Sequence, residues 1–87
     1  MNDDEKYKLL GYVMASEYRI NILKSINDTI KTPSSIASEI DLRTNHVSNV
    51  LKDLKEKKLV VCLNEEAHKG RLYKNTDLGI EILEFIK

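Results

Sequence analysis

The chain has 87 residues, of which 14 are Lys or Arg and 14 are Asp or Glu, so its formal net charge is zero. This length accommodates one small domain and disfavours a large enzyme with a deep cofactor cleft. The single cysteine, Cys62, excludes an internal disulfide and a zinc site built from several cysteines. The longest apolar run, residues 59–63, is far shorter than the roughly 20 residues that cross a bilayer. The acidic N-terminus differs from a signal peptide, so we expect a cytoplasmic protein.

The charges are unevenly distributed along the chain. Residues 1–42 hold five bases and seven acids, and residues 76–87 hold one base and three acids. Residues 43–75 hold eight bases and four acids, which leaves a local excess of four positive charges. A polyanion meets a local surface rather than the sum over the chain. Zero net charge therefore does not exclude nucleic acid as a partner, although a short basic segment is also compatible with an ordinary solvated face.

Four helices are predicted in the first two thirds of the chain. The first covers residues 1–15, with acids at its start and apolar residues every three or four positions. The second begins after Ser16, a favourable N-cap. Thr32 followed by Pro33 predicts the start of a short third helix, because proline suits the first helical position. A longer fourth helix covers about residues 44–57.

The hydrophobic period changes after the fourth helix. Apolar residues at 59–63 and a looser alternation at 72–76 predict two strands, joined by a polar loop. Thr76 is the expected N-cap of a last helix over residues 77–87. We therefore expect residues 1–87 to form a single domain, mainly α-helical, with a small β-hairpin before the closing helix.

A short helix, a turn and a longer helix form a helix-turn-helix unit, and a hairpin directly after it is a wing. In this chain the unit covers residues 32–57 and the wing residues 59–76. The longer helix has one apolar side, and its other side carries the short polar residues Asn45, Ser48 and Asn49. Asn forms two hydrogen bonds with adenine, and Ser donates or accepts, so this side is suited to reading base edges in DNA.

Three segments of the chain also carry a family resemblance, in one colinear order over about residues 16–86. They are residues 32–60 (TPSSIASEIDLRTNHVSNVLKDLKEKKLV), 69–83 (KGRLYKNTDLGIEIL) and 16–26 (SEYRINILKSI). These resemble, respectively, the helix-turn-helix core, the wing with the closing helix, and the first core helix of the ArsR/MarR-like winged-helix transcription regulators, particularly the small archaeal ones.

The resemblance implies a sequence-specific regulator that binds double-stranded DNA. The helix at about 44–57 would lie in the major groove, and the wing loop at 64–71 would contact the minor groove or the phosphates. The implied reading set is Arg43, Thr44, Asn45, His46, Ser48, Asn49 and Lys52. The implied phosphate contacts are Ser34 and Ser35, and the implied wing tip is His68, Lys69 and Arg71.

The chain departs from the family at three positions. Gly is usual where Asp41 and Lys58 stand, and an apolar residue is usual where Asn75 stands. Asp adopts a left-handed backbone more readily than Lys does. These departures concern local geometry rather than the fold.

The first and last helices carry more apolar residues than a three-helix core requires. The residues concerned are Leu9, Tyr12, Val13, Ile82, Phe85 and Ile86. In the family, such helices often form the dimer interface, and two-fold pairing places two reading helices about 34 Å apart. We therefore expect a homodimer, with simple closure of the core as the alternative.

No residue pattern indicates catalysis or a cofactor. Cys62 falls in an apolar strand, where a packed thiol is commoner than a nucleophile. His46 and His68 fall on the elements expected to face DNA, and no spacing of Cys, His or Asp fits a metal site. We predict no enzymatic activity, no metal and no cofactor, and no small-molecule ligand is evident.

Two other functions remain open. A winged-helix protein-interaction adaptor that does not bind DNA is favoured by the zero net charge and by Asp53 and Glu56, acids on the outer side of the longer helix. An RNA-associated winged helix is the third possibility.

Overall fold

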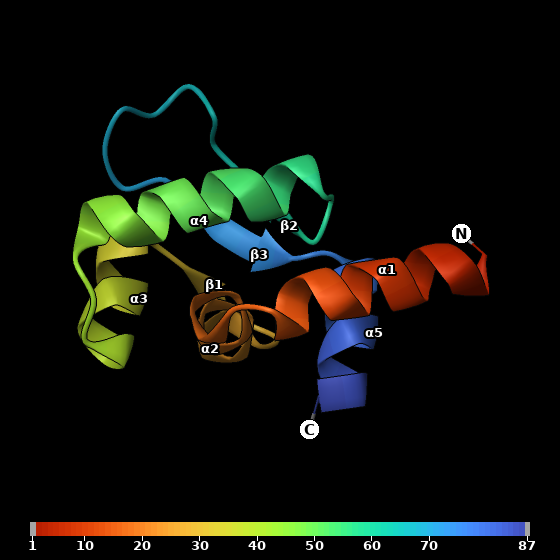
Figure 1. Ribbon diagram of the computed structural model, residues 1–87. Coiled ribbons are helices and arrows are strands. Elements are labelled where there is room, and N and C mark those ends of the chain that lie inside the picture. The colour runs from red at the N-terminus through yellow and green to blue at the C-terminus, as the bar shows by residue number, and fades with distance from the viewer. Residues whose placement is uncertain (1, 87) are drawn as a thin grey trace.

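The computed structural model describes residues 2–86, which form five helices and a small antiparallel sheet (Figure 1). The helices are α1 (Asp3–Met14), α2 (Glu17–Ile26), α3 (Pro33–Ile40), α4 (Thr44–Glu56) and α5 (Asp77–Ile86). The strands are β1 (Ile30–Lys31), β2 (Val60–Cys62) and β3 (Tyr73–Asn75). The prediction of a mainly α-helical fold with a hairpin wing is confirmed. Met1 and Lys87, which we placed in the first and last helices, lie outside the described residues.

The sequence analysis missed β1, which turns the predicted hairpin into a three-stranded sheet of order β1-β3-β2. Ile30 pairs with Lys74, and Lys31 pairs with Tyr73. Two residues are too few to show the alternation of a strand, and the pairing partner is distant in the sequence. No local signal could therefore have identified β1.

The three predicted N-caps have the expected geometry. The side-chain oxygens of Ser16, Thr32 and Thr76 each accept a hydrogen bond from the backbone N–H three residues later, at 3.4, 3.2 and 3.1 Å. Each bond satisfies a donor that the first turn of a helix leaves without a partner. The starts of α2, α3 and α5 are thus determined by local sequence.

Asp41 and Lys58 both adopt the left-handed backbone, with φ of 57° and 63°. These are positions where the resembling family usually has Gly, so the turns keep their geometry although both residues carry a Cβ. Asn75, the third departure, is buried. Its Nδ2 donates to the backbone oxygens of Leu23 and Asn27, at 3.1 and 2.9 Å, and so attaches the end of α2 to β3.

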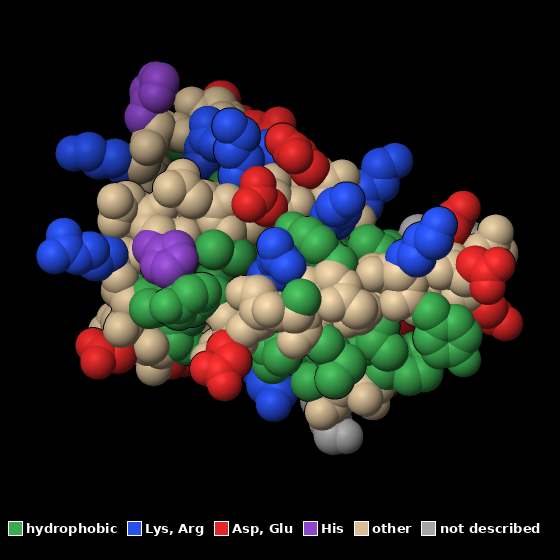
Figure 2. Space-filling model, viewed as in Figure 1, with side chains coloured by type: hydrophobic (Ala, Val, Ile, Leu, Met, Phe, Trp, Pro, Cys, Tyr) green, Lys and Arg blue, Asp and Glu red, His purple; other side chains and the backbone are tan. Residues whose placement is uncertain are grey.

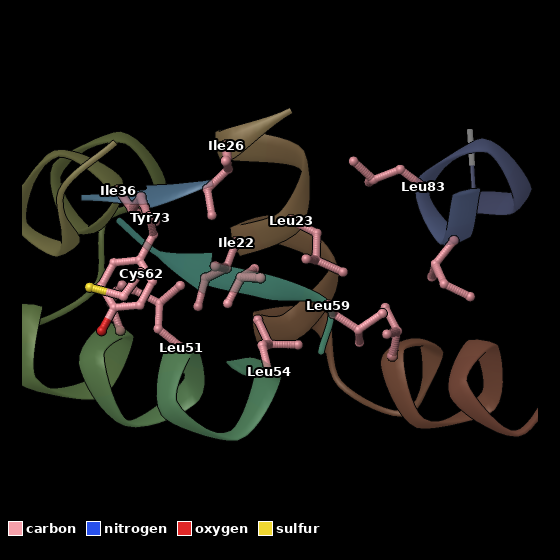
Figure 3. Packing of buried hydrophobic residues seen from close by; sticks show 14 of the residues in the cluster. Ile22, Leu23, Ile26, Ile36, Leu51, Leu54, Leu59, Cys62, Tyr73 and Leu83 are labelled. Atoms are coloured by element: carbon pink, nitrogen blue, oxygen red, sulfur yellow. The ribbon is translucent and has the colours of Figure 1, made fainter. Parts of the chain in front are cut away.

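The hydrophobic core is centred on α2, which packs against α1, α3, α4, α5 and β3. Figure 3 shows that side chains from α2, α4, the sheet and α5 meet in one cluster. Its fully buried members include Ile22, Leu23, Ile26, Ile36, Leu51, Leu54 and Leu59. Because α3 and α4 share this core, their relative orientation is set by the packing.

Val13 and Ile82 belong to the same core and have no exposed surface. They lie on the inner sides of α1 and α5, so they offer no area that a second copy could cover. The prediction that these two residues form part of a dimer interface is therefore wrong.

Candidate nucleic-acid interface

Helix α4 presents its polar side to solvent along one face of the molecule. Val47, Leu51 and Leu54 are fully buried, whereas Asn45 and Asn49 on the other side are exposed. In the structure the wing loop comprises residues 63–72, between β2 and β3. In Figure 1 this loop arches above α4, and α3 lies below the start of α4. The helix is therefore fixed by its apolar side, with Asn45 and Asn49 outward.

A cavity of about 540 Å³ lies between the start of α3, the side of α4 and the wing loop. Its lining includes five side chains with a hydroxyl group, namely Thr32, Ser34, Thr44, Ser48 and Tyr73. It also includes the basic side chains of Lys52, Lys55, Lys69 and Arg71, together with His68. No acidic residue of the described chain lines it. Hydroxyl and cationic groups are the donors that bind phosphate oxygens in proteins.

Most of the predicted DNA-binding residues meet at this cavity. They are Ser34 on α3, then Thr44, Ser48, Asn49 and Lys52 on α4, and His68, Lys69 and Arg71 on the wing loop. The fold thus brings together side chains from three elements that are separate in the sequence.

Four predicted residues lie outside the cavity. Ser35, Arg43 and Asn45 are exposed and adjoin cavity residues in the sequence, but they do not line the cavity themselves. His46 contacts α2 instead, where its ring lies edge-on to Tyr18 with the ring centroids 4.5 Å apart. The ring of His46 therefore stabilises the contact between α2 and α4, on a side of α4 away from the cavity lining.

The wing loop has a defined shape of its own. Arg71 donates from Nε to the backbone oxygen of Ala67 at 2.8 Å, and from Nη2 to that of Glu65 at 3.0 Å. Asn64 bridges the two ends of the loop. Its Oδ1 accepts a hydrogen bond from the Leu72 N–H at 2.7 Å, and its Nδ2 donates to the Gly70 backbone oxygen at 3.3 Å. Gly70 allows the tight return with φ of 66°. Arg71, predicted at the wing tip, thus also holds the loop together.

Lys55 is a cavity residue that the sequence analysis did not select. Its Nζ donates to Glu65 Oε1 at 2.5 Å and links α4 to the wing loop. The hydrogen bond from Lys55 lowers the pKa of Glu65, and the bond to Glu65 raises the pKa of Lys55. Lys55 follows Lys52 by three residues, so helical spacing alone could have placed it on the same side of α4.

The surface distribution of side chains separates two regions. Figure 2 shows Lys and Arg side chains, with some Asp and Glu among them, over α4 and the wing loop, and a group of hydrophobic side chains over α1 and α5. The large exposed residues of the second region are Tyr7, Met14 and Phe85, which are 65, 57 and 58% exposed. An ion pair between Lys6 and Glu81, at 2.9 Å, joins the two helices.

The predicted interface residues on α1 and α5 differ in their exposure. Phe85 is exposed, whereas Leu9, Tyr12 and Ile86 are partly buried against the core. The Tyr12 ring also lies under the guanidinium of Arg19, 3.8 Å from its centroid. The apolar surface available to a partner is therefore contributed mainly by Phe85 and by the exposed residues of α1.

Neither a metal site nor a membrane span is found in the described part of the chain. Residues 2–86 contain no cluster of three His, Cys, Asp or Glu side chains arranged to hold a metal ion. No helix formed by these residues has the length and apolar character needed to span a bilayer. Cys62 is buried in β2, with Sγ directed at Asn64 Oδ1 at 3.7 Å.

Similar architectures occur among solved structures. HlyU from Vibrio cholerae is 22% identical with a TM-score of 0.78, and the match covers 99% of this chain and 94% of that one. A fragment of Mb0332 from Mycobacterium bovis is 16% identical with a TM-score of 0.75, and the match covers 99% and 83%. That fragment is described as a homodimeric winged helix-turn-helix DNA-binding domain of a possible ArsR-family regulator. The present chain has a winged helix-turn-helix fold.

The winged helix also matches part of a longer chain. The C30AH42A mutant of ZitR from Lactococcus lactis is 19% identical with a TM-score of 0.71, and the match covers 82% of this chain but only 49% of that one. No protein-family model and no curated protein sequence matches the chain. None of these structures supports the narrower resemblance to small archaeal regulators. At these identities the similarity concerns the fold.

Proposed function

We propose that the protein is a sequence-specific regulator of transcription that occupies a promoter in the cytoplasm, where it is associated with the nucleoid. The observation that carries this proposal is the cavity beside α4, which is lined by hydroxyl and basic side chains from α3, α4 and the wing loop. Phosphate contacts position a protein on DNA, and contacts to base edges give the specificity. The interface offers both kinds of group side by side.

In this proposal α4 enters the major groove with its exposed polar side. Asn49 and Ser48 supply groups for base edges, and Lys52 can reach a guanine or a phosphate. The start of α3 and the wing loop, with Ser34 and Lys69, contact the phosphates on either side. Arg43, Thr44 and Asn45 at the start of α4 extend the reading surface.

The proposed active form is a homodimer. The exposed apolar side chains of α1 and α5 support it, because contiguous apolar surface marks an interaction site more often than a free surface. The homodimeric description of the similar Mb0332 fragment supports it as well. A two-fold arrangement places the two copies of α4 about one DNA turn, 34 Å, apart on a palindromic site.

A salt titration with duplex DNA tests the proposal. The logarithm of the association constant should fall linearly with the logarithm of salt concentration, at about 0.9 per phosphate contact. Asn49→Ala should reduce the preference among base sequences by about 1–3 kcal/mol, whereas Lys69→Ala should weaken all sequences alike and reduce the salt slope by about one contact. Binding that ignores salt would contradict the proposal. Selection of bound sequences from a random DNA pool would reveal the half-site symmetry.

A protein-interaction adaptor is the rival function. Asp53 and Glu56 favour the adaptor, because both acids are exposed on α4 and would repel the DNA phosphates if the helix lay flat in the groove. The adaptor predicts no affinity for duplex DNA at low salt, together with a protein partner that is lost when the exposed side of α4 is changed. Competition between duplex DNA and hairpin RNA for the protein distinguishes the third possibility, an RNA-associated winged helix, from a DNA-binding regulator.

A further inference from the structure

The carboxylate of Glu65 neutralises a cation of the proposed DNA-binding surface. Lys55 lines the cavity beside α4, and its Nζ donates to Glu65 Oε1 at 2.5 Å. Glu65 itself belongs to the wing loop and does not line the cavity. Its side chain is 59% exposed, against 35% for Lys55. The pair therefore lies at the boundary between the cavity and solvent, where an incoming phosphate would compete with the carboxylate.

The shape of the wing loop does not depend on this carboxylate. Arg71 holds the backbone oxygens of Glu65 and Ala67, and Asn64 holds both ends of the loop. All these bonds use groups other than the Glu65 side chain, whose ion pair in the described residues is with Lys55. The carboxylate thus has an electrostatic role that can be separated from the folding of the loop.

Both members of the pair are charged at neutral pH. The hydrogen bond from Lys55 lowers the pKa of Glu65 from its usual value, and the bond to Glu65 raises the pKa of Lys55 from its usual value. The cavity accordingly presents Lys52 and Lys69 as cations without an ion pair in residues 2–86, while the charge of Lys55 is balanced by Glu65, whose pKa the nearby Arg71 also lowers.

We infer that Glu65 is a built-in competitor of DNA phosphate for Lys55, and that it lowers the affinity for DNA of any base sequence. This inference rests on the proposed function. Non-specific affinity arises almost entirely from phosphates that meet free cations, so engaging one cation internally reduces it directly. Contacts to base edges are unaffected, because they are made by the exposed side of α4. Glu65 thereby favours discrimination between sequences over affinity.

The variant Glu65→Gln tests the inference because it removes the charge and keeps the shape. Release of Lys55 to one further phosphate should raise the affinity for a random-sequence duplex about eightfold at 0.1 M salt and steepen the salt slope by about 0.9. The matched control is Glu66→Gln. Glu66 is an exposed acid of the same loop, for which the described structure shows no hydrogen bond or ion pair. The Glu66→Gln variant should raise the affinity for the random-sequence duplex less than Glu65→Gln does and leave the salt slope unchanged.

A second background separates the ion pair from a general charge effect. In Lys55→Gln, the additional change Glu65→Gln should alter the affinity no more than Glu66→Gln does. Thermal unfolding of each variant verifies that the fold is retained. The inference is overturned if Glu65→Gln weakens binding, if it equals Glu66→Gln, or if its effect persists without Lys55. If no variant, including the unchanged protein, binds duplex DNA at 0.05 M salt, the proposed function itself fails.

Discussion

Gly79, in the first turn of α5, lies against the backbone of the turn that joins α4 to β2. A Cβ added at Gly79 would lie 2.2 Å from the Leu59 oxygen and 3.3 Å from its carbonyl carbon. The same oxygen accepts hydrogen bonds from Thr76 N and Oγ1, at 3.0 and 3.2 Å. The group in the way is therefore backbone that is already bonded, and it cannot rotate aside as a flexible side chain would. Gly79→Ala must shift the start of α5.

The expected change in the free energy of unfolding is the sum of opposing contributions. Alanine stabilises a helix by about 1 kcal/mol relative to glycine. Overpacking against a rigid neighbour costs about 1–3 kcal/mol, and weakening a hydrogen bond to Leu59 costs about 1 kcal/mol more. We expect Gly79→Ala to lower the free energy of unfolding by about 2 kcal/mol, measured by urea unfolding with circular dichroism. At this chain length, that corresponds to a Tm lower by about 10 °C.

Gly11 supplies a matched control for this substitution. It lies within α1, and a Cβ added there meets no atom within 4 Å. Gly11→Ala should therefore raise the free energy of unfolding by up to about 1 kcal/mol through helix propensity alone. If Gly79→Ala were as stable as the unchanged protein, or if both substitutions had the same sign, the steric explanation would be refuted.

Three further substitutions test other parts of the structure. Asn75→Ala removes both hydrogen bonds to the end of α2 and should lower the free energy of unfolding in urea by about 1–3 kcal/mol; an unchanged value would mean that these bonds contribute nothing net. Lys58→Gly relieves the left-handed backbone at this turn, where φ is 63°, and should stabilise the fold by about 1 kcal/mol, measured as a higher Tm. Phe85→Ser removes exposed apolar surface from α5 and should shift the proposed dimer to monomer in sedimentation while the helical circular dichroism is retained, whereas an unchanged dimer would exclude Phe85 from the interface.

The features that sequence reasoning predicted well are those encoded within a few residues. Thr32 with Pro33, and Thr76 with the apolar pattern after it, specify helix starts through one short side-chain to backbone bond each. Features made by residues far apart in the chain were missed. The pairing of β1 with β3 and the contact of Tyr18 with His46 each need the finished fold to bring the partners together.

The apolar residues of α1 and α5 illustrate a second limit. The hydrophobic periodicity of the sequence identifies the apolar side of a helix. It does not distinguish the apolar residues that pack in the core of the same chain from those that stay exposed to solvent. Val13 is fully buried, while Met14, its neighbour in the chain, is 57% exposed. Both belong to the apolar pattern of α1, yet only Val13 was assigned to the predicted interface. Burial in the folded chain is needed to separate them.

Charge presents the same difficulty in another form, because a sum of zero conceals where each charge acts. The acids Asp3, Asp4 and Glu5 begin α1, and Figure 1 places the start of α1 at the opposite end of the molecule from the start of α4. Exposed charges separated by more than about 8 Å are largely screened at physiological salt. These acids cancel the Lys and Arg of the cavity in the sum but only weakly in the potential that DNA meets. Glu65 contributes the same single charge to the sum, yet it acts at hydrogen-bonding distance from Lys55. In the proposed complex with DNA, the position of this one carboxylate therefore bears more on affinity than the balance of the whole chain.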